Sequence, residues 1–168
     1  MSPGPQSIMK HILRQKRDRK SALWRCRKCK RTFANRNQSH FCGTLRPLEH
    51  HFKGRPAAIH DLFELVCAMV KACGPVTVLP EKSRIAFHVR MSFMVVSVQQ
   101  TGLRGHFVLA SVCPHPRFLR IQTFSPKNHL HEFRVSKPSD LDATFASWVS
   151  QAYEVGCQRH LDLTCAPK

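Results

Sequence analysis

Three cysteines and one histidine between residues 26 and 42 have the spacing of a metal-binding knuckle. The pattern is C-x2-C, then ten residues, then H-x-C, and its members are Cys26, Cys29, His40 and Cys42. Three thiolates and one imidazole are the soft and borderline donors that a tetrahedral structural zinc prefers. Four protein ligands leave no open position for a substrate, so the pattern predicts a structural zinc ion and not a catalytic one.

Other interpretations of these cysteines are weaker. Three cysteines cannot form a closed set of disulfides, and a redox C-x2-C normally lies in a βαβ unit, which this polar and basic stretch does not resemble. A free thiol or disulfide pair stays as the alternative. His50 and His51, just downstream, offer a substitute ligand but are more simply surface residues. Ten residues between the pairs and one inside H-x-C predict a compact knuckle without a long recognition helix, with Phe33 packed under the metal.

Positive charge is concentrated in the N-terminal third of the chain. The 168 residues carry a formal charge of +17, and residues 1–55 hold fifteen lysines and arginines against only Asp18 and Glu49. Such an excess attracts nucleic-acid phosphates, and it attracts acidic proteins by the same physics. We therefore expect nucleic acid as the partner, with an acidic protein as the alternative.

The residues of the predicted nucleic-acid interface lie in the basic arm and around the cluster. They are Lys16, Arg17, Arg19, Lys20, Trp24, Arg25, Arg27, Lys28, Lys30, Arg31 and Arg36. Trp24 and Phe41 are expected either to stack on unpaired bases or to pack inside the knuckle. No set of side chains indicates reading of base edges, so low sequence specificity is expected.

The composition predicts a protein of the reducing cytoplasm. The apolar runs are too short to span a bilayer, and no apolar segment with a small-residue cleavage site opens the chain. The other five cysteines are an odd number scattered among apolar neighbours, which favours buried reduced thiols. They are Cys67, Cys73, Cys113, Cys157 and Cys165.

Composition and periodicity divide the chain into five segments. We expect a basic flexible arm at 1–23, the knuckle at 24–42, a linker at 43–55, an α+β domain at 56–156 and a tail at 157–168. In the domain, apolar residues recur with a period of 3.6 over about 56–73 and 140–155, which predicts two helices, the second capped by Ser139. Six runs predict strands, at 76–79, 85–91, 93–99, 103–110, 118–124 and 129–135.

The strands and helices together predict the fold class. Most connections between strands are too short for parallel crossovers, so we expect an antiparallel meander. The predicted fold is α+β, a two-layer sandwich of five or six antiparallel strands with the N-terminal and C-terminal helices on one face. In the second strand, one face is expected to be core and the other basic. The core face would carry Ile85, Phe87, Val89 and Met91, and the open face Arg84, Ala86, His88 and Arg90.

The open face of the sheet and the nearby loops supply a second, different candidate site. Residues that together could hold a small anionic ligand, through a phosphate or carboxylate, are Lys82, Arg84, His88, Arg90, His115, Arg117, His131 and Arg134. In this alternative the knuckle is a docking module. The chain has no G-x-S-x-G motif, no P-loop and too few acidic residues for a two-metal nuclease. We therefore assign no catalytic residue and expect a non-enzymatic protein.

Several motifs resemble those of a known family. The stretch W-x-C-x2-C-x-R-x-F-A-x-R-N-Q-S-H-x-C looks like bacterial proteins that join a zinc knuckle to an α+β domain, the domain of unknown function numbered 5655. The likeness runs from Trp24 to about residue 156 and includes the stretches 48–56, 74–76, 82–87, 89–93, 115–118, 131–134 and 140–142. Such knuckles usually read C-P-x-C-G, where this chain has Arg27 and Lys30. The resemblance implies a fold and a zinc site but no activity.

Overall fold

The computed structural model describes residues 23–33 and 36–164, and the side chains of 162–164 are not included in the description. The predicted interface residues Lys16, Arg17, Arg19 and Lys20 therefore lie outside the described residues, as does Cys165. The chain divides after His40 into two compact units, and each is described by itself.

The first unit is built on a small hairpin. Strands β1 (Trp24–Arg25) and β2 (Thr32–Phe33) pair antiparallel, with Trp24 opposite Phe33. The connection between them carries Cys26 and Cys29 in a tight turn. The hairpin therefore presents the C-x2-C pair at one end and brings two aromatic side chains together beside it.

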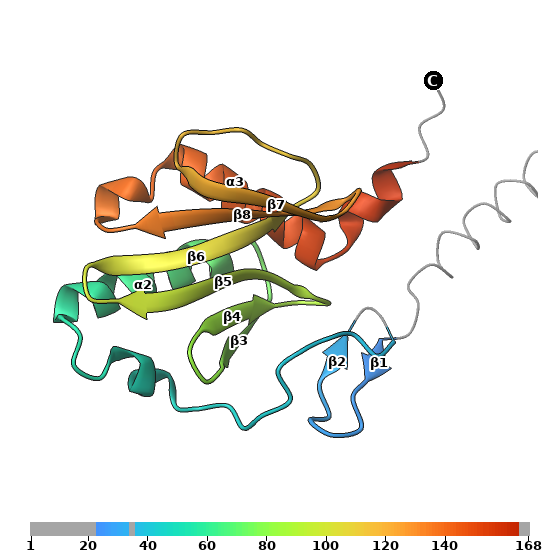
Figure 1. Cartoon of the computed structure of the whole chain (residues 1–168), viewed down its shortest axis with the longest axis horizontal. Helices are drawn as coiled ribbons and strands as arrows, with labels where there is room; N and C mark the ends of the chain where they lie inside the picture. The colour runs from blue at the N-terminus through green and yellow to red at the C-terminus, as the bar shows by residue number, and fades with distance from the viewer. Residues whose placement is uncertain (1–22, 34–35, 165–168) are drawn as a thin grey trace, which may run out of the picture. The chain divides into compact units, whose positions relative to one another are not determined.

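The second unit is an α+β sandwich, which confirms the predicted fold class (Figure 1). Its helices α2 (Ala57–Ala72) and α3 (Ala143–Gly156) lie on the same face of a six-stranded antiparallel sheet and contact each other. The strands are β3 (Thr77–Pro80), β4 (Ile85–His88), β5 (Ser92–Gln99), β6 (Gly102–Leu109), β7 (Phe118–Ser125) and β8 (Asn128–Val135). The short 3-10 helices are η1 (Leu48–Phe52), η2 (Pro138–Asp140) and η3 (Arg159–Thr164).

The core lies between the helices and the sheet. Its fully buried aromatic side chains come from both layers, and they include Phe63 of α2, Phe107 of β6, Phe133 of β8 and Phe145 of α3. Phe107 stacks on Phe133 with 4.4 Å between ring centroids, and Phe145 meets Phe133 edge to ring at 5.1 Å. The apolar stripes predicted for the two helices are thus the surfaces that close this core.

The ends of the helices are set by particular residues. Gly74, just past α2, has φ +142°, and a Cβ there would lie 2.4 Å from the Tyr153 hydroxyl oxygen, so only glycine fits. That hydroxyl donates a hydrogen bond to the Pro75 carbonyl at 3.0 Å. The prediction of Ser139 as the cap of the second helix is wrong. The helix begins at Ala143, and its N-cap is Asp142, whose carboxylate accepts from the Phe145 N–H at 2.8 Å.

The sheet is antiparallel but is not a simple meander. The strand order is β3-β4-β5-β6-β8-β7, so β8 lies between β6 and β7. The segment between Leu109 and Phe118 is long enough to carry the chain past the position of β8. The interior position suits β8 because His131, Phe133 and Val135 bury one face, whereas most of β7 is exposed.

Strand β4 ends earlier than the sequence predicts. The register between β4 and β5 shifts after Phe87, and the chain turns back beyond His88. The backbone N–H groups of Arg90 and Met91 both donate to the carbonyl of Gly156, at 3.1 and 3.3 Å. Arg90 and Met91 are therefore in a turn bound to the end of α3, and Ala86 and His88, expected on an open face, are buried.

The described part of the chain shows two further features. None of its helices is long and apolar enough to cross a membrane. None of its seven cysteines forms a disulfide, and Cys67 is buried in the core, where burial raises the pKa of its thiol to about 12. Cys67 is therefore an unreactive packing residue at neutral pH.

Candidate metal centre and basic surfaces

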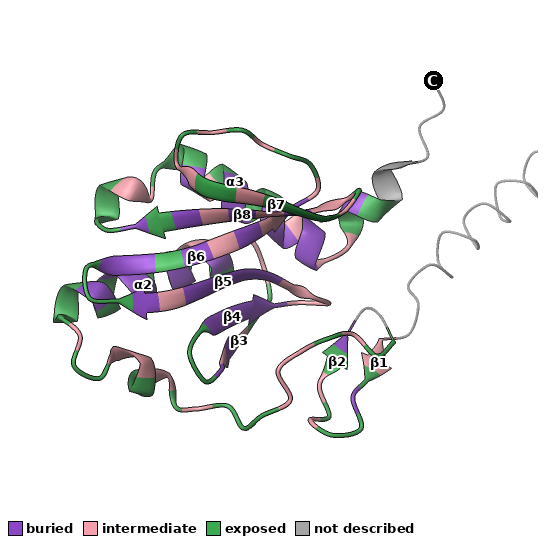
Figure 2. Ribbon diagram, viewed as in Figure 1, coloured by how far each residue is buried: buried purple, intermediate pink, exposed green. Residues whose placement is uncertain are grey.

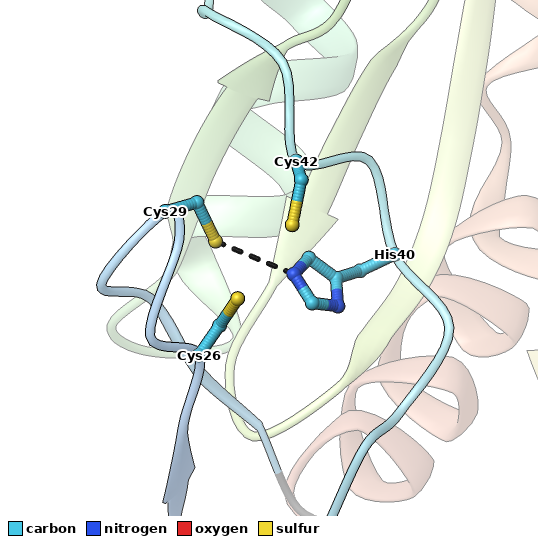
Figure 3. A group of neighbouring side chains, drawn as sticks. All are labelled: Cys26, Cys29, His40 and Cys42. Carbon is cyan, nitrogen blue, oxygen red and sulfur yellow. Dashed lines mark hydrogen bonds between the residues drawn. The ribbon is translucent and has the colours of Figure 1, made fainter.

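The four predicted ligands come together. One ligand atom from each of Cys26, Cys29, His40 and Cys42 lies within 4.8 Å of all the others (Figure 3). Cys29 Sγ is 3.3 Å from His40 Nε2. A sulfur and a nitrogen bound tetrahedrally to zinc would be about 3.6 Å apart, given bond lengths of about 2.3 and 2.0 Å. The cluster thus has close to the dimensions that a tetrahedral ion requires.

Backbone hydrogen bonds hold the C-x2-C turn. The N–H of Cys26 donates to the Arg31 carbonyl, and the N–H of Lys30 donates to the Cys26 carbonyl, both at 2.9 Å. Lys30 has φ 62°, in the left-handed region that favours glycine. This is the position where similar knuckles have glycine. The tight turn therefore forms with a lysine, at a conformational cost of about 1 kcal/mol.

His40 is oriented by its neighbours as a metal ligand. Its Nδ1 lies 2.6 Å from the Gln38 carbonyl oxygen, which can only accept, so Nδ1 carries the proton. The Nε2 lone pair then points toward Cys29 and the other thiols. The imidazole also packs on Phe33, with 4.0 Å between ring centroids, which confirms that Phe33 packs beneath the site. A carbonyl that fixes the tautomer in this way is a usual partner of a metal-bound histidine.

The protonation of the site favours metal binding. Burial acts to raise the pKa of Cys29, but hydrogen bonds from Arg31, Cys26 and His40 outweigh it and lower that pKa to about 6. Burial acts to lower the pKa of His40, but the Gln38 carbonyl and the two thiols outweigh it and raise that pKa. One thiol is therefore already a thiolate at neutral pH, and its charge attracts either a proton on His40 or a cation in the cluster.

Trp24 lies on the same aromatic cluster and is partly exposed. Its ring is 6.0 Å from Phe33 and meets His40 edge to ring at 5.9 Å. The packing role that the sequence left open for Trp24 is therefore present. The rest of its surface lines a hollow of about 440 Å³, together with Cys26, Arg27, Lys28, Arg36 and Asn37. This volume is within the range of about 300 to 1,000 Å³ typical of ligand sites.

The surface of the knuckle is rich in positive charge, and the sequence has no Asp or Glu from residue 23 to residue 40. Arg25, Arg27, Lys28, Lys30 and Arg36 are exposed, and Arg31 is partly exposed. The ion pairs found between His60 and Arg159 do not include the five exposed residues, and Arg31 hydrogen-bonds to Cys29. Trp24 and the six basic residues of the predicted interface thus lie in one small unit around the cluster.

The residues of the predicted anion site are distributed over both faces of the sheet. Several of them make packing and hydrogen-bond contacts on the side of the sheet that the helices cover. Arg117 holds both carboxylate oxygens of Asp142 at 2.9 Å and lies over the Trp148 ring. His115 meets the same ring, and fully buried His131 accepts from the Cys113 N–H at 2.9 Å. The contacts of Arg117 and His115 attach the loop before β7 to α3, and the contact of His131 attaches it to β8.

The remaining members lie elsewhere. His88 is buried beside Ser92, Arg90 donates to Gln158 at 3.2 Å, and Lys82 is exposed in the loop between β3 and β4. Arg84 pairs with Glu81, and Arg134 donates to Thr101 at 2.6 Å. Of the eight predicted residues, the structure leaves Arg84 and Arg134 on the open side of the sheet.

Sequence reasoning missed two residues of that open side. Arg104 and His106 are on β6, where Leu103 and Phe107 are buried in the core and the alternate positions point the other way. Figure 2 shows buried bands alternating with exposed or intermediate bands along β6. The signal that could have found them is the alternation of Arg104 and His106 with Leu103 and Phe107 in the sequence. A hollow of about 330 Å³ on this face is lined by Arg84, Arg104, His106 and Glu132 among others.

Comparison with known proteins assigns the larger unit to a family. Residues 48–156, which are 109 of the 168 residues, match the family described as Domain of unknown function (DUF5655). No curated protein and no solved structure matches the chain. The match begins at η1 and ends with α3, and so it covers the entire sandwich. The chain therefore belongs to the DUF5655 family, whose members share this domain of unknown function.

Proposed function

We propose that this chain is a non-enzymatic zinc protein whose basic knuckle binds nucleic acid through phosphates, with low sequence specificity. The observation that carries the proposal is the hollow beside the cluster, where Arg27, Lys28 and Arg36 converge on the partly exposed ring of Trp24. Cationic side chains next to an aromatic face are the combination that proteins use for unpaired nucleotides.

Zinc is the metal that best suits the cluster. Three sulfurs and one imidazole nitrogen favour zinc over calcium, magnesium or manganese, which prefer oxygen ligands. The geometry of four ligands around one point supports a closed structural site. Its role would be to fix the C-x2-C turn and thereby hold Arg27 and Lys28 in place. Because the thiolates must stay reduced, we place the protein in the reducing cytoplasm.

The electrostatics support contact with phosphates. The exposed cations of the knuckle have no carboxylate partner among the described residues, and the sequence has no Asp or Glu from residue 23 to residue 40. Each phosphate that they neutralise would release condensed counterions, which provides most of the affinity at low salt. Lys16, Arg17, Arg19 and Lys20 would add further contacts of the same kind.

The first experiment is purification without nuclease treatment. We expect nucleic acid to co-purify, giving a high ratio of absorbance at 260 to 280 nm that falls after nuclease treatment. An acidic protein that co-purifies instead, unaffected by nuclease, would contradict the proposal in favour of a protein-interaction adaptor.

Salt dependence of binding to an unstructured oligonucleotide provides the quantitative test. For roughly five phosphate contacts the slope of log affinity against log salt should be about −3.5. Replacing Arg27, Lys28 and Arg36 together with alanine should flatten it by about 2 without loss of zinc, because none of the three is a ligand. The matched control changes three exposed basic residues of the other unit, Lys53, Lys137 and Arg159. If both triple variants flattened the salt slope equally, the result would contradict an interface on the knuckle.

A further inference from the structure

The open face of the sheet carries a row of side chains in register across all six strands. Paired positions run in the order Leu79, Ala86, Val95, His106, Glu132 and Arg120. The first three form a small buried cluster separate from the main core. The row therefore changes along its length from apolar on β3, β4 and β5 to polar and charged on β6, β8 and β7.

A second row beside it is strongly basic. Ser97 on β5 pairs with Arg104 on β6, and Arg104 pairs with Arg134 on β8. Like charges directly opposite each other on neighbouring strands destabilise a sheet. Glu132 offsets this repulsion in part, because it accepts a hydrogen bond from Arg104 Nε. Departures of this kind from favourable pairing are expected chiefly at functional or strained sites.

The two ion pairs of this face leave guanidinium donors exposed. Glu81 accepts from Arg84 Nε at 2.7 Å, and Glu132 accepts from Arg104 Nε. The arginine side chains remain 49% and 58% exposed, and their terminal Nη groups make no hydrogen bond to any residue that the structure describes. The carboxylates thus fix the direction of each arginine while leaving the outer donors for another acceptor.

His106 lines the same hollow as these two arginines. It is half-buried, and its ring has no hydrogen-bond partner in the described part of the chain. Burial and, next, the positive charge of Arg84 lower its pKa to about 4, although Glu132 acts to raise it. His106 is therefore neutral at physiological pH and can donate or accept one hydrogen bond.

We propose that the hollow on this open face binds a small organic anion. Arg84 and Arg104 would hold its carboxylate or phosphate, and its apolar body would rest on Val95 and Leu130. All four residues line the hollow, whose volume of about 330 Å³ suits a compact ligand. Charge favours an anion, because Arg84, Arg104 and Arg134 exceed Glu81 and Glu132 by one. The proposal is independent of the knuckle and of nucleic-acid binding.

Phenyl phosphate and benzoate are suitable probes, because each joins an apolar ring to one of the two anionic groups. The full-length protein, labelled with nitrogen-15, should show saturable shift changes at the amides of Ser97 and His106, with Kd of about 1 mM. The better of the two probes identifies the anionic group. Phenol should not bind. Absence of saturation with both probes up to about 50 mM would overturn the proposal.

Variants separate a ligand site from ordinary surface ion pairs. Arg104→Gln and, from another strand, Arg84→Gln should each weaken binding by about tenfold. Glu132→Gln should strengthen it several-fold, because it removes a negative charge beside the bound anion while the amide oxygen can still accept from Arg104 Nε. The matched control is Arg159→Gln, which breaks the exposed pair with Glu154 and should change Kd less than about twofold.

Two results would overturn the proposal even if binding occurs. One is an equal loss in Arg159→Gln, which would indicate general charge attraction. The other is an oligonucleotide that shifts Ser97 and His106, and loses that effect in Arg104→Gln, while neither small probe binds. Such a result would assign the face to nucleic acid.

Discussion

The two units of the chain use their charged side chains in opposite ways. In the sandwich, several arginines have a carboxylate partner, such as Arg117 with Asp142 and Arg159 with Glu154. In the knuckle, the exposed basic residues between Arg25 and Arg36 have no such partner among the described residues. The units differ in what they bury too, since the sandwich buries many apolar side chains, whereas the first unit supplies two sulfurs and an imidazole to the Cys/His cluster. Net charge therefore locates a binding surface only after paired charges are set aside.

The largest expected effect is loss of the metal from the knuckle. Cys26→Ser should abolish binding of one zinc ion per chain and unfold the knuckle, since metal binding supplies about 10 kcal/mol or more of folding free energy in small zinc units. The sandwich has its own core and should keep its melting temperature. Elemental analysis and thermal melting followed by circular dichroism provide the two measurements.

The control for this experiment is a cysteine of the other unit. Cys113→Ser should retain zinc, because Cys113 is not part of the cluster. If Cys26→Ser lowered the melting temperature of the sandwich by several degrees, the two units would share stability and the contrast between them would fail.

The next effect concerns where the sandwich begins. Phe52 of η1 contacts Phe63, with 5.2 Å between ring centroids, and packs on the main core with Leu48. Phe52→Ala should therefore lower the free energy of unfolding by about 2 to 3 kcal/mol, measured by urea denaturation. Leu65→Ala, at an exposed position of α2, should cost less than about 0.5 kcal/mol. Equal effects would mean that residues 43–55 are only a linker, as the sequence suggested.

The sandwich should lose stability in mild acid because of His106. Its pKa of about 4 is below the ordinary value of 6.5, so the unfolded chain binds a proton more readily. Above pH 6.5 the ring is neutral in both states and costs no stability. As the pH falls toward 4 the free energy of unfolding decreases, and the loss is about 2 kcal/mol at pH 4.5. The charged groups that line the same hollow as His106 are Arg84, Arg104 and Glu132.

His106→Gln tests this directly, because glutamine does not titrate. The difference in unfolding free energy between pH 7 and pH 4.5 should shrink by about 2 kcal/mol in this variant. His60→Gln, at an exposed histidine near Glu64, should leave that difference nearly unchanged. An unaltered pH dependence in His106→Gln would show that the ring is not held neutral by its surroundings.

The smallest effect is a gain in the knuckle. Lys30→Gly should tighten metal binding about fivefold, equivalent to about 1 kcal/mol, because glycine adopts the left-handed conformation of that residue without steric cost. Lys28→Gly, at a position without positive φ, should loosen binding slightly. Competition with a zinc chelator measures both. Weaker binding in Lys30→Gly would indicate that the lysine side chain itself supports the site.

The sequence predicted what short-range patterns control. The helix expected over 56–73 spans Ala57–Ala72, and the four ligands converge as their spacing indicated. Strand order was wrong because pairing of β8 with β6 depends on burial across the whole sheet, which no local pattern contains. Early termination of β4 depends on the carbonyl of Gly156, which is distant in sequence.

The candidate sites show the same difference between local sequence patterns, which were sufficient, and tertiary contacts, which the sequence does not reveal. Cysteine spacing was sufficient for the cluster, since its members are within seventeen residues of one another. The anion site was assembled from basic residues by type alone, and so it mixed residues of both faces. His131 and Arg117 serve packing because their partners, Cys113 and Asp142, could be found only from tertiary contacts.

The carbonyl of Gly156 has a consequence for local unfolding. It accepts hydrogen bonds from both Arg90 and Met91. Only glycine fits at position 156, because a Cβ there would lie 2.5 Å from the Phe93 ring. Fraying of the last turn of α3 would therefore release the turn between β4 and β5 at the same moment. In native-state hydrogen exchange the amides of Arg90 and Met91 should exchange together with that last helical turn, as one cooperative opening of segments far apart in the chain.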